Sequence, residues 1–219
     1  MDGNKRQKTP RADHRSVQGD TAGRIVSAAT RLFADKGYDG TSVKDICDAA
    51  GVNIAAINYH FVSKDNLCRH IIEQFAAENL DSARRTLQAS RTADDFKVRL
   101  EVFLRQTIET MIRQKDIVRL IQQELDKPES RCSNLLRDTF VKHTQTLTEF
   151  FDQARKNGIG SPEVEPPFAA SFLMSHIAQQ TRIDGVFRKA AGYSLSDEKY
   201  RTRWIQQTIR LLTGGLLVK

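Results

Sequence analysis

The stretch from Thr41 to Leu67, TSVKDICDAAGVNIAAINYHFVSKDNL, holds a compact group of side chains suited to contacts with DNA. The methyl groups of Ile54 and Ala55 can meet the methyl group of thymine, and Asn58 carries the donor–acceptor pair that matches the edge of adenine. Small side chains also let a helix backbone approach the floor of a major groove. These residue types predict that the segment reads base edges in double-stranded DNA.

Side chains suited to phosphate oxygens surround this group. Tyr59, His60 and Lys64 can donate hydrogen bonds to phosphates, which position a protein on DNA without reading its sequence. The N–H groups at helix N-termini can do the same, and Ser42 and Ser63 are of the type that caps such termini. The alternatives are a Tyr59 ring that packs partly against the protein and a Lys64 side chain that is merely solvated.

Two short helices separated by a glycine-containing turn must position these side chains. The first would run from Ser42 to Ala50, with Ser42 as its N-cap and Asp45 as a capping-box partner. Gly51 supplies the turn, and Asn53 can cap the second helix. One face of each helix is apolar, with Val43, Ile46, Cys47 and Ala50 in the first and Ile57 and Phe61 in the second. The pattern predicts a helix-turn-helix, in which Cys47 is a small core residue rather than a redox sensor.

Helical spacing recurs through the whole chain, and nothing alternates at period two for long enough to predict a sheet. A first helix has apolar residues at i, i+3, i+4, i+7 and i+8, namely Ile25, Ala28, Ala29, Leu32 and Phe33, and Gly37 can end it. A long helix begins at Ser63. Further amphipathic stretches follow at 96–111, 118–125, 135–154, 168–188 and 197–213. The predicted fold class is all-α, with about nine helices.

The charge of the chain favours a polyanionic partner without locating it, since 34 Lys and Arg stand against 27 Asp and Glu, a net charge of +7. Residues 1–19 are polar and hold five basic residues, Lys5, Arg6, Lys8, Arg11 and Arg15, against two acidic ones. We expect a mobile basic arm there, which either contacts DNA or only aids solubility. A helix-turn-helix domain at 20–66 and a helical domain at 67–219 complete the expected organisation.

Residues 20–70 contain six basic and six acidic residues, so their summed charge is zero. A DNA-binding domain of this composition needs its acids on the side that does not face DNA. We therefore expect Asp35, Asp39, Asp45 and Asp48 to lie off that side, and Lys44, Lys64 and the cap N–H groups to lie on it.

The region resembles the TetR family of bacterial transcriptional regulators. The similarity runs from about Arg24 to Ile71 and rests on three blocks taken together, AAxxLFADKGYDGTSV, IxxAAGV and YHFVSKDNL. In that family three helices form a DNA-binding head, and a long fourth helix leads to a helical C-terminal domain. The resemblance implies that ten residues face DNA or its phosphates: Thr41, Ser42, Lys44, Asn53, Ala55, Ala56, Asn58, Tyr59, His60 and Lys64.

Two residues depart from the family pattern. A serine or threonine cap is commoner where this chain has Asn53, and an aromatic or neutral residue is frequent where it has His60. Within the family, the segments NIAAINYHF and QQELDKP are most similar to the CecR-like branch, whose namesake responds to cephalosporin and chloramphenicol.

The resemblance also implies a C-terminal domain that binds an effector and forms a homodimer through the last two helices, about 168–188 and 197–213. A two-fold protein that reads two half-sites fits the physics, because one short helix makes few base contacts. The effector and its contacts are unknown from sequence. Aromatic or polar residues on the apolar faces of the middle helices are pocket candidates or ordinary core, namely Phe103, Thr107, Met111, Phe140, His143, Phe151, His176 and Gln180.

The sequence thus predicts a sequence-specific transcriptional regulator, a repressor released from a palindromic operator by a small-molecule effector. A DNA-binding factor that senses no small molecule, or an activator, is the alternative. An all-α enzyme is not expected, because the chain has no HExxH, no phosphate-cradling glycine loop and no nucleophile elbow. The five histidines are scattered without ligand-like spacing, so no metal or cofactor is expected.

Compartment follows from what the chain lacks. Three cysteines without a CxxC pair indicate a reducing environment. No apolar run approaches the roughly 20 residues of a membrane-spanning helix, and the first 20 residues have no apolar segment of a signal peptide. The chain is therefore expected to be cytoplasmic and to have no membrane partner.

Overall fold

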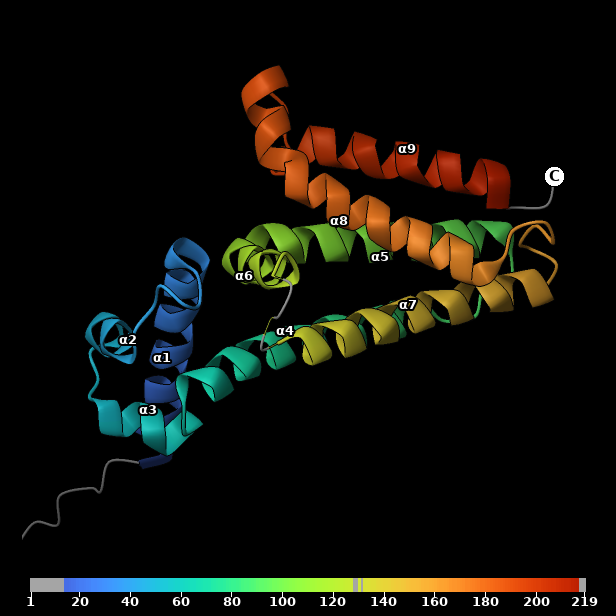
Figure 1. Cartoon of the computed structure of the whole chain (residues 1–219). Helices are drawn as coiled ribbons and strands as arrows, with labels where there is room; N and C mark the ends of the chain where they lie inside the picture. Colours follow the sequence, from blue (N-terminus) through green and yellow to red (C-terminus); the bar gives the residue numbers. More distant parts are fainter. Residues whose placement is uncertain (1–13, 128–129, 131, 217–219) are drawn as a thin grey trace, which may run out of the picture. The chain divides into compact units, whose positions relative to one another are not determined.

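The computed structural model describes residues 14–127, 130 and 132–216. In this part of the chain there are nine helices (Figure 1): α1 (His14–Lys36), α2 (Val43–Ala50), α3 (Ile54–Phe61), α4 (Lys64–Thr86), α5 (Ala93–Arg113), α6 (Lys115–Leu125), α7 (Ser133–Lys156), α8 (Pro166–Ala191) and α9 (Glu198–Leu216). The predicted all-α fold with about nine helices is confirmed.

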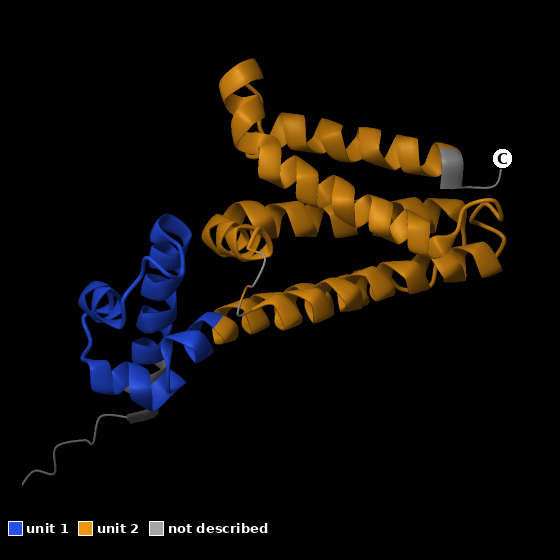
Figure 2. Ribbon diagram, in the orientation of Figure 1, with its two compact units in different colours: residues 1–68 blue, residues 69–219 orange. Residues whose placement is uncertain are grey.

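The chain divides into two compact units, residues 1–68 and 69–219, and the division falls inside α4 (Figure 2). We call the first unit the head and the second the C-terminal unit. The sequence placed this boundary two residues earlier, at 66, so the two divisions differ only in Leu67 and Cys68, which the structure groups with the head.

The first helix begins earlier than its apolar pattern predicts. α1 starts at His14, so residues 14–19, which the sequence assigned to the arm, are helical. The helix includes Gly19, since a glycine inside a helix costs only about 1 kcal/mol relative to alanine. The rest of the expected arm, residues 1–13, lies outside the described residues.

The head is built on large side chains that the three short amphipathic segments bury together. Ile25, Phe33, Ile46, Ile57 and Leu67 have almost no exposed surface. Each such side chain contributes about 1.5–3 kcal/mol on removal from water. This small core fixes how α1, α2, α3 and the start of α4 lie against one another within the head.

The C-terminal unit has its own core, in which α8 packs along α7 and α9 packs along α5 (Figure 1). Its aromatic centre includes the stacked rings of Phe96 and Phe150, whose centroids lie 4.8 Å apart. Thr92 caps α5 by accepting a hydrogen bond from the N–H of Asp95 at 3.1 Å. α8 begins at Pro166, two residues before the predicted start, since proline is well suited to a first helical position. Among the described helices, none combines the length and apolar character required to cross a membrane.

Candidate functional site

The helix α3 presents a two-sided surface of the kind the sequence predicts. Ile57 and Phe61 are buried in the head, while Ile54, Ala55, Asn58 and Tyr59 are exposed, Tyr59 to 71%. Ala56 and His60 are partly buried at the margin of this exposed face. The side chains expected to read base edges therefore lie together on the open side of one helix.

The start of α3 is fixed by its own cap. The Asn53 Oδ1 atom accepts a hydrogen bond from the N–H of Ala56 at 3.0 Å. The cap that departs from the family pattern is thus competent, because the amide oxygen of asparagine accepts this hydrogen bond as the hydroxyl oxygen of serine would. Further along the helix, the rings of Tyr59 and His60 meet edge to face, with centroids 5.0 Å apart.

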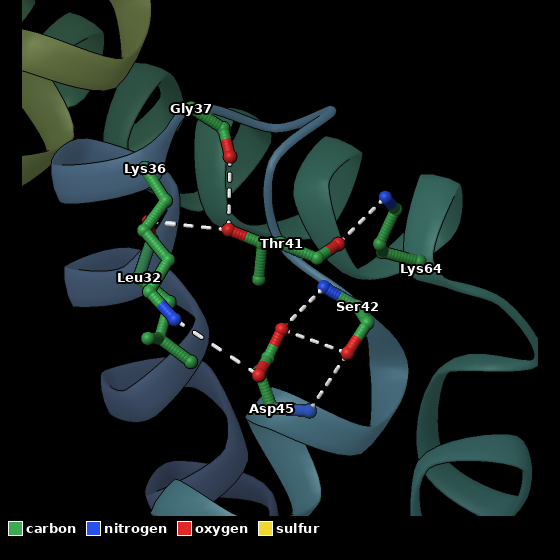
Figure 3. Close-up of polar contacts among 7 residues, drawn as sticks. All are labelled: Leu32, Lys36, Gly37, Thr41, Ser42, Asp45 and Lys64. Atoms are coloured by element: carbon green, nitrogen blue, oxygen red, sulfur yellow. Dashed lines mark hydrogen bonds and ion pairs between the residues drawn. The ribbon is translucent and has the colours of Figure 1, made fainter.

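The start of α2 carries the expected capping box (Figure 3). The Ser42 hydroxyl oxygen accepts from the N–H of Asp45 at 3.0 Å, and the Asp45 carboxylate accepts from the N–H of Ser42 at 2.9 Å. The hydrogen bonds from the Ser42 backbone and hydroxyl hold the pKa of Asp45 below its usual value. Lys36 Nζ lies 3.9 Å from the same carboxylate.

The capping box predicted for Ser42 and Asp45 is confirmed, because the Asp45 carboxylate accepts from the N–H of Ser42. That Asp45 lies off the side facing DNA stays a prediction. Two N–H groups at this helix N-terminus, those of Ser42 and Asp45, already have partners inside the protein. The contact of Ser42 with a phosphate, which stays a prediction, would have to compete with a carboxylate three residues away.

Thr41 lies inside the head, whereas the family resemblance implies a position that faces DNA or its phosphates. Only 1% of the residue is exposed. Its hydroxyl lies 2.8 Å from the carbonyl oxygen of Gly37 and 3.2 Å from that of Leu32, to which it donates (Figure 3). The reason is the tight turn after α1, where unpaired carbonyl groups of the helix C-terminus need a donor.

Lys64 is also held within the head. Its Nζ atom donates to the carbonyl oxygens of Tyr38 at 3.0 Å and Thr41 at 2.8 Å, and lies 4.1 Å from the centre of the Tyr38 ring. The Tyr38 hydroxyl in turn donates to the carboxylate of Asp65. We call these four residues the Lys64 clamp. Two of the three N–H bonds of the ammonium group point to protein carbonyls, so the predicted phosphate contact has at most one left.

The Lys64 clamp closes a turn with little steric freedom. Gly37 has a left-handed φ of 76°, and a Cβ added to Gly40 would overlap the carbonyl oxygen of Lys36. The clamp joins residues more than 20 positions apart in sequence. No local pattern in the sequence signals such a contact, which explains why the sequence offered only a phosphate contact or a solvated side chain for Lys64.

The turn from α3 to α4 contains an unusual backbone. Val62 has φ 67° and ψ −41°, and it has the only positive φ of a non-glycine residue in the described part of the chain. The N–H of Ser63 donates to the carbonyl of Phe61 at 2.7 Å across it, the geometry of a γ-turn with positive φ. Ser63 caps α4 as predicted, since its hydroxyl accepts from the N–H of Asn66 at 3.1 Å.

Arg24 is a structural residue of the head that the sequence argument missed. Its guanidinium donates to the carbonyl oxygen of Ala50 at 3.1 Å, at the end of α2. Gly51 follows with a left-handed φ of 64° and caps the helix. Arg24 thus links α1 to the turn between α2 and α3. Lys44, the lysine of α2, is exposed to solvent.

The C-terminal unit contains a cavity of about 400 Å³. Helices α4 to α8 contribute to its wall, which is mostly apolar. Five of the eight candidates line it, namely Phe103, Thr107, Met111, Phe140 and His143. Phe151, His176 and Gln180 do not; Phe151 is core, and His176 stacks on Trp204 with ring centroids 4.8 Å apart.

Glu124 and one nitrogen of His143, both in this wall, have defined partners. Glu124 is 3% exposed, and its two carboxylate oxygens accept from Lys127 Nζ and Ser130 Oγ, each at 2.7 Å. His143 Nδ1 lies 2.9 Å from the carbonyl oxygen of Thr139. Burial lowers the pKa of His143 below its usual 6.5.

The candidate residues for a metal site or a reactive thiol were also located in the described part of the chain. Within the described ranges no three His, Cys, Asp or Glu side chains come together as a metal site requires. The three cysteines are free and buried, and burial, with the charge of Asp48, raises the pKa of the Cys47 thiol. A buried thiol of raised pKa is a poor nucleophile, which agrees with a core role for Cys47.

The last two helices expose large apolar side chains. Phe168 and Phe172 on α8 and Leu211 on α9 are more than half exposed, Leu211 to 77%, and so is Val186 nearer the end of α8. Phe172 and His176 stack with ring centroids 6.2 Å apart. Such exposed apolar surface is typical of a protein–protein contact.

Comparison with known proteins gives a consistent result. Residues 25–71 match the family model described as bacterial regulatory proteins, TetR family. The probable regulator YttP of Bacillus subtilis is 34% identical over 77 residues, which are 34% of this chain and 37% of that protein. The regulator UidR of Escherichia coli is 24% identical over 197 residues, which are 90% of this chain and 93% of UidR. The repressor KstR2 of Rhodococcus jostii is 29% identical over 116 residues, or 53% and 55% of the two chains.

Among solved structures, the regulator FadR of Bacillus subtilis in complex with stearoyl-CoA superimposes with a TM-score of 0.73 at 16% identity, covering 88% of this chain and 98% of FadR. This similarity shows that the fold is shared over both units' lengths. The CecR-like branch stays a prediction.

Proposed function

The chain belongs to the TetR family of bacterial transcriptional regulators, and we propose that it represses transcription by binding a palindromic operator until a small molecule fills its cavity. The observation that carries this proposal is the exposed face of α3, with Ile54, Ala55 and Asn58 on one side and a buried Ile57 on the other. The relative KstR2 is a repressor by name. A bacterial operator lies in the cytoplasm, which is where we place the protein.

The DNA contacts that we propose follow from this face. Ile54, Ala55 and Asn58 read base edges in the major groove, with Ala56 at the margin allowing close approach. Tyr59, His60 and the exposed Lys44 bind phosphate oxygens. Ser42 and Asn53 act first as caps, and we place phosphate contacts at both helix N-termini, where a phosphate near Ser42 would compete with the Asp45 carboxylate for the Ser42 N–H. Thr41 takes no part, because it is buried.

We further propose that the protein acts as a homodimer through α8 and α9. An eight-residue recognition helix contacts few bases, so useful specificity needs two half-sites. The exposed apolar side chains of α8 and α9, such as Phe168 and Leu211, supply a surface that a second copy would cover. Two-fold symmetry then matches a palindromic operator.

The cavity supports small-molecule sensing over the alternative of a regulator that senses none, which would have a filled core. Its volume of about 400 Å³ is in the range of ligand sites. The helix α4 contributes Ile72 and Phe75 to the wall of the cavity and Lys64 to the clamp of the head. A ligand that shifts α4 by a coupling free energy of about 1–3 kcal/mol would change operator affinity about 5–150-fold.

The test is a fluorescence-anisotropy titration against DNA from upstream of the protein's own gene, with a shuffled fragment as control. Wild type should prefer the native fragment and lose affinity steeply with salt. Asn58→Ala should lose about 1–3 kcal/mol on the native fragment and little on the shuffled one. Equal affinity of the wild type for both fragments would refute the specific operator. Equal loss on both fragments would show that Asn58 reads no base.

A further inference from the structure

The charged residues of the cavity wall all come from one short stretch of the chain. They are Glu124, Lys127 and Arg137, at the end of α6, after it, and in the first turns of α7. All other residues of the wall are apolar or have a neutral polar side chain, apart from the titratable His143. Whether the cavity accepts a charged or an uncharged ligand therefore depends on whether these three side chains are free to pair with it.

The protein itself satisfies the buried charge. The Glu124 carboxylate accepts from Lys127 and from Ser130, so both oxygens have partners and the pair is neutral. The Arg137 side chain is 70% exposed and lies beside Asp138, with Nε 3.8 Å from its carboxylate. An ionic group brought into this cavity would lose its water without gaining a buried counter-charge, which is costly.

The neutral polar groups are arranged differently. A carbonyl oxygen only accepts, so the Nδ1 atom of a neutral His143 must carry the proton that it donates to Thr139. Its Nε2 atom is then an acceptor, and no residue in the described part of the chain donates to it. Thr107 on α5 likewise makes no hydrogen bond to the preceding turn within the described residues, whereas Thr144 and Thr148 on α7 do.

We propose that the cavity binds an uncharged, largely apolar molecule that carries a hydroxyl group, and that this hydroxyl donates to Nε2 of His143. The apolar wall, with Phe103 and Met111, takes the body of the molecule, and the Thr107 hydroxyl lies in the same wall for a second polar contact. The volume equals that of about 13 water molecules at liquid density. The inference rests on the proposed function of the cavity as the effector site.

Three probes of equal chain length separate the ligand classes, namely 1-decanol, its methyl ether and decanoate, each titrated calorimetrically into the full-length protein at pH 7.5. The alcohol should bind about tenfold more tightly than the ether, which cannot donate. Decanoate should also bind about tenfold more weakly, because its charge has no free partner. Equal binding of alcohol and ether, or tightest binding of decanoate, would overturn the proposal. The second result would favour an anionic acyl ligand.

Variants of His143 assign the contact. His143→Leu should weaken 1-decanol about tenfold and leave the ether unchanged. His143→Gln, which keeps an acceptor at a comparable reach, should restore most of the preference. His70→Leu, an exposed histidine of α4 outside the cavity wall, is the matched control and should change neither probe. A preference for the alcohol that survives in His143→Leu would contradict the assignment.

Blocking the cavity shows where the probes bind. Ala178→Phe places a ring in the wall and should abolish binding of all three, with circular dichroism confirming an unchanged helical fold. Met174→Phe serves as a second filling variant if the first does not fold, and binding that persists in a folded filling variant would overturn the proposal. Operator affinity is measured separately. Binding of 1-decanol without any operator binding would refute the proposed repressor function but support the proposed ligand class. Operator binding without any alcohol binding would refute the ligand class but support the repressor function.

Discussion

The ammonium group of Lys64 has a structural role in the head that differs from the phosphate contact predicted from the sequence. Its place at the start of a helix that follows a recognition helix predicts a phosphate contact. The structure shows that it bonds the carbonyl oxygens of Tyr38 and Thr41. A cation used in this way closes the turn between α1 and α2, on which the position of the capping box depends.

We expect Lys64→Ala to loosen the head. Loss of two charge-assisted hydrogen bonds should lower the local stability of the head by about 2 kcal/mol. Hydrogen exchange followed by mass spectrometry should show faster exchange of the amides at 38–45. Operator affinity should fall because fewer heads are correctly folded.

Lys44→Ala is the matched control, since Lys44 is exposed on α2. It should leave exchange unchanged and reduce the salt slope of DNA binding by about one. If Lys64→Ala instead behaves as Lys44→Ala does, then Lys64 is a phosphate contact and the clamp is not needed for folding.

At the scale of residues, the sequence predicted contacts between residues that are close together in the chain. The buried Ile57 and Phe61, the Asn53 cap and the Ser42–Asp45 capping box depend on residues within four positions, so their spacing encodes them. Thr41 could not be placed, because its partner carbonyls belong to the end of α1 across a turn. The same holds for Arg24 and Ala50, which are 26 residues apart.

At the scale of elements, the amphipathic pattern predicted the type of each helix better than its ends. α1 extends to His14 because polar residues before Ile25 carry no periodic signal and are nonetheless compatible with a helix. α8 starts at Pro166, although the pattern marked Phe168 as the first residue. The sequence named five residues of the cavity wall among its eight candidates, but it could not separate them from ordinary core, because no local pattern specifies the helix packing that brings Phe103 and His143 into one wall.

The turn between α3 and α4 makes a prediction of its own. Val62 combines a β-branched side chain with φ 67°, a conformation that disfavours any residue with a Cβ. Val62→Gly should therefore stabilise the head by about 1 kcal/mol, after allowing for the greater freedom of glycine in the unfolded chain.

Urea unfolding or the exchange of head amides measures this gain. Val62→Ala is the control, since alanine keeps the Cβ and should retain most of the strain. The residue is 72% exposed, so neither change removes much buried surface. A gain in Val62→Ala as large as that in Val62→Gly would show that the strain does not come from the Cβ.

At the scale of the whole molecule, the assembly decides whether the head can read an operator. A stable dimer interface buries roughly 1,200–2,000 Å² in total, and apolar side chains exposed along α8 and α9 are candidates for its centre. A charge placed there should be costly, because dimer formation would bury it without a partner.

We expect Leu211→Glu to shift the protein to monomers in sedimentation equilibrium and to weaken operator binding by at least tenfold. Val98→Glu is the matched control, since Val98 is an exposed apolar residue of α5. It should leave both the mass and the affinity unchanged. A Leu211→Glu protein that remains dimeric would exclude this part of α9 from the interface.

The division of α4 between the two units sets the smallest piece of this protein that can be exchanged between regulators. The head ends after Cys68, so it takes with it Lys64 and Asp65, which hold the turn at Tyr38. A chimera joined at the end of α3 would contain the recognition surface of this protein but would lack Lys64 and Asp65, which stabilise the turn at Tyr38. Recombination that swaps sensors while preserving the operator must therefore cut inside a helix rather than at a loop.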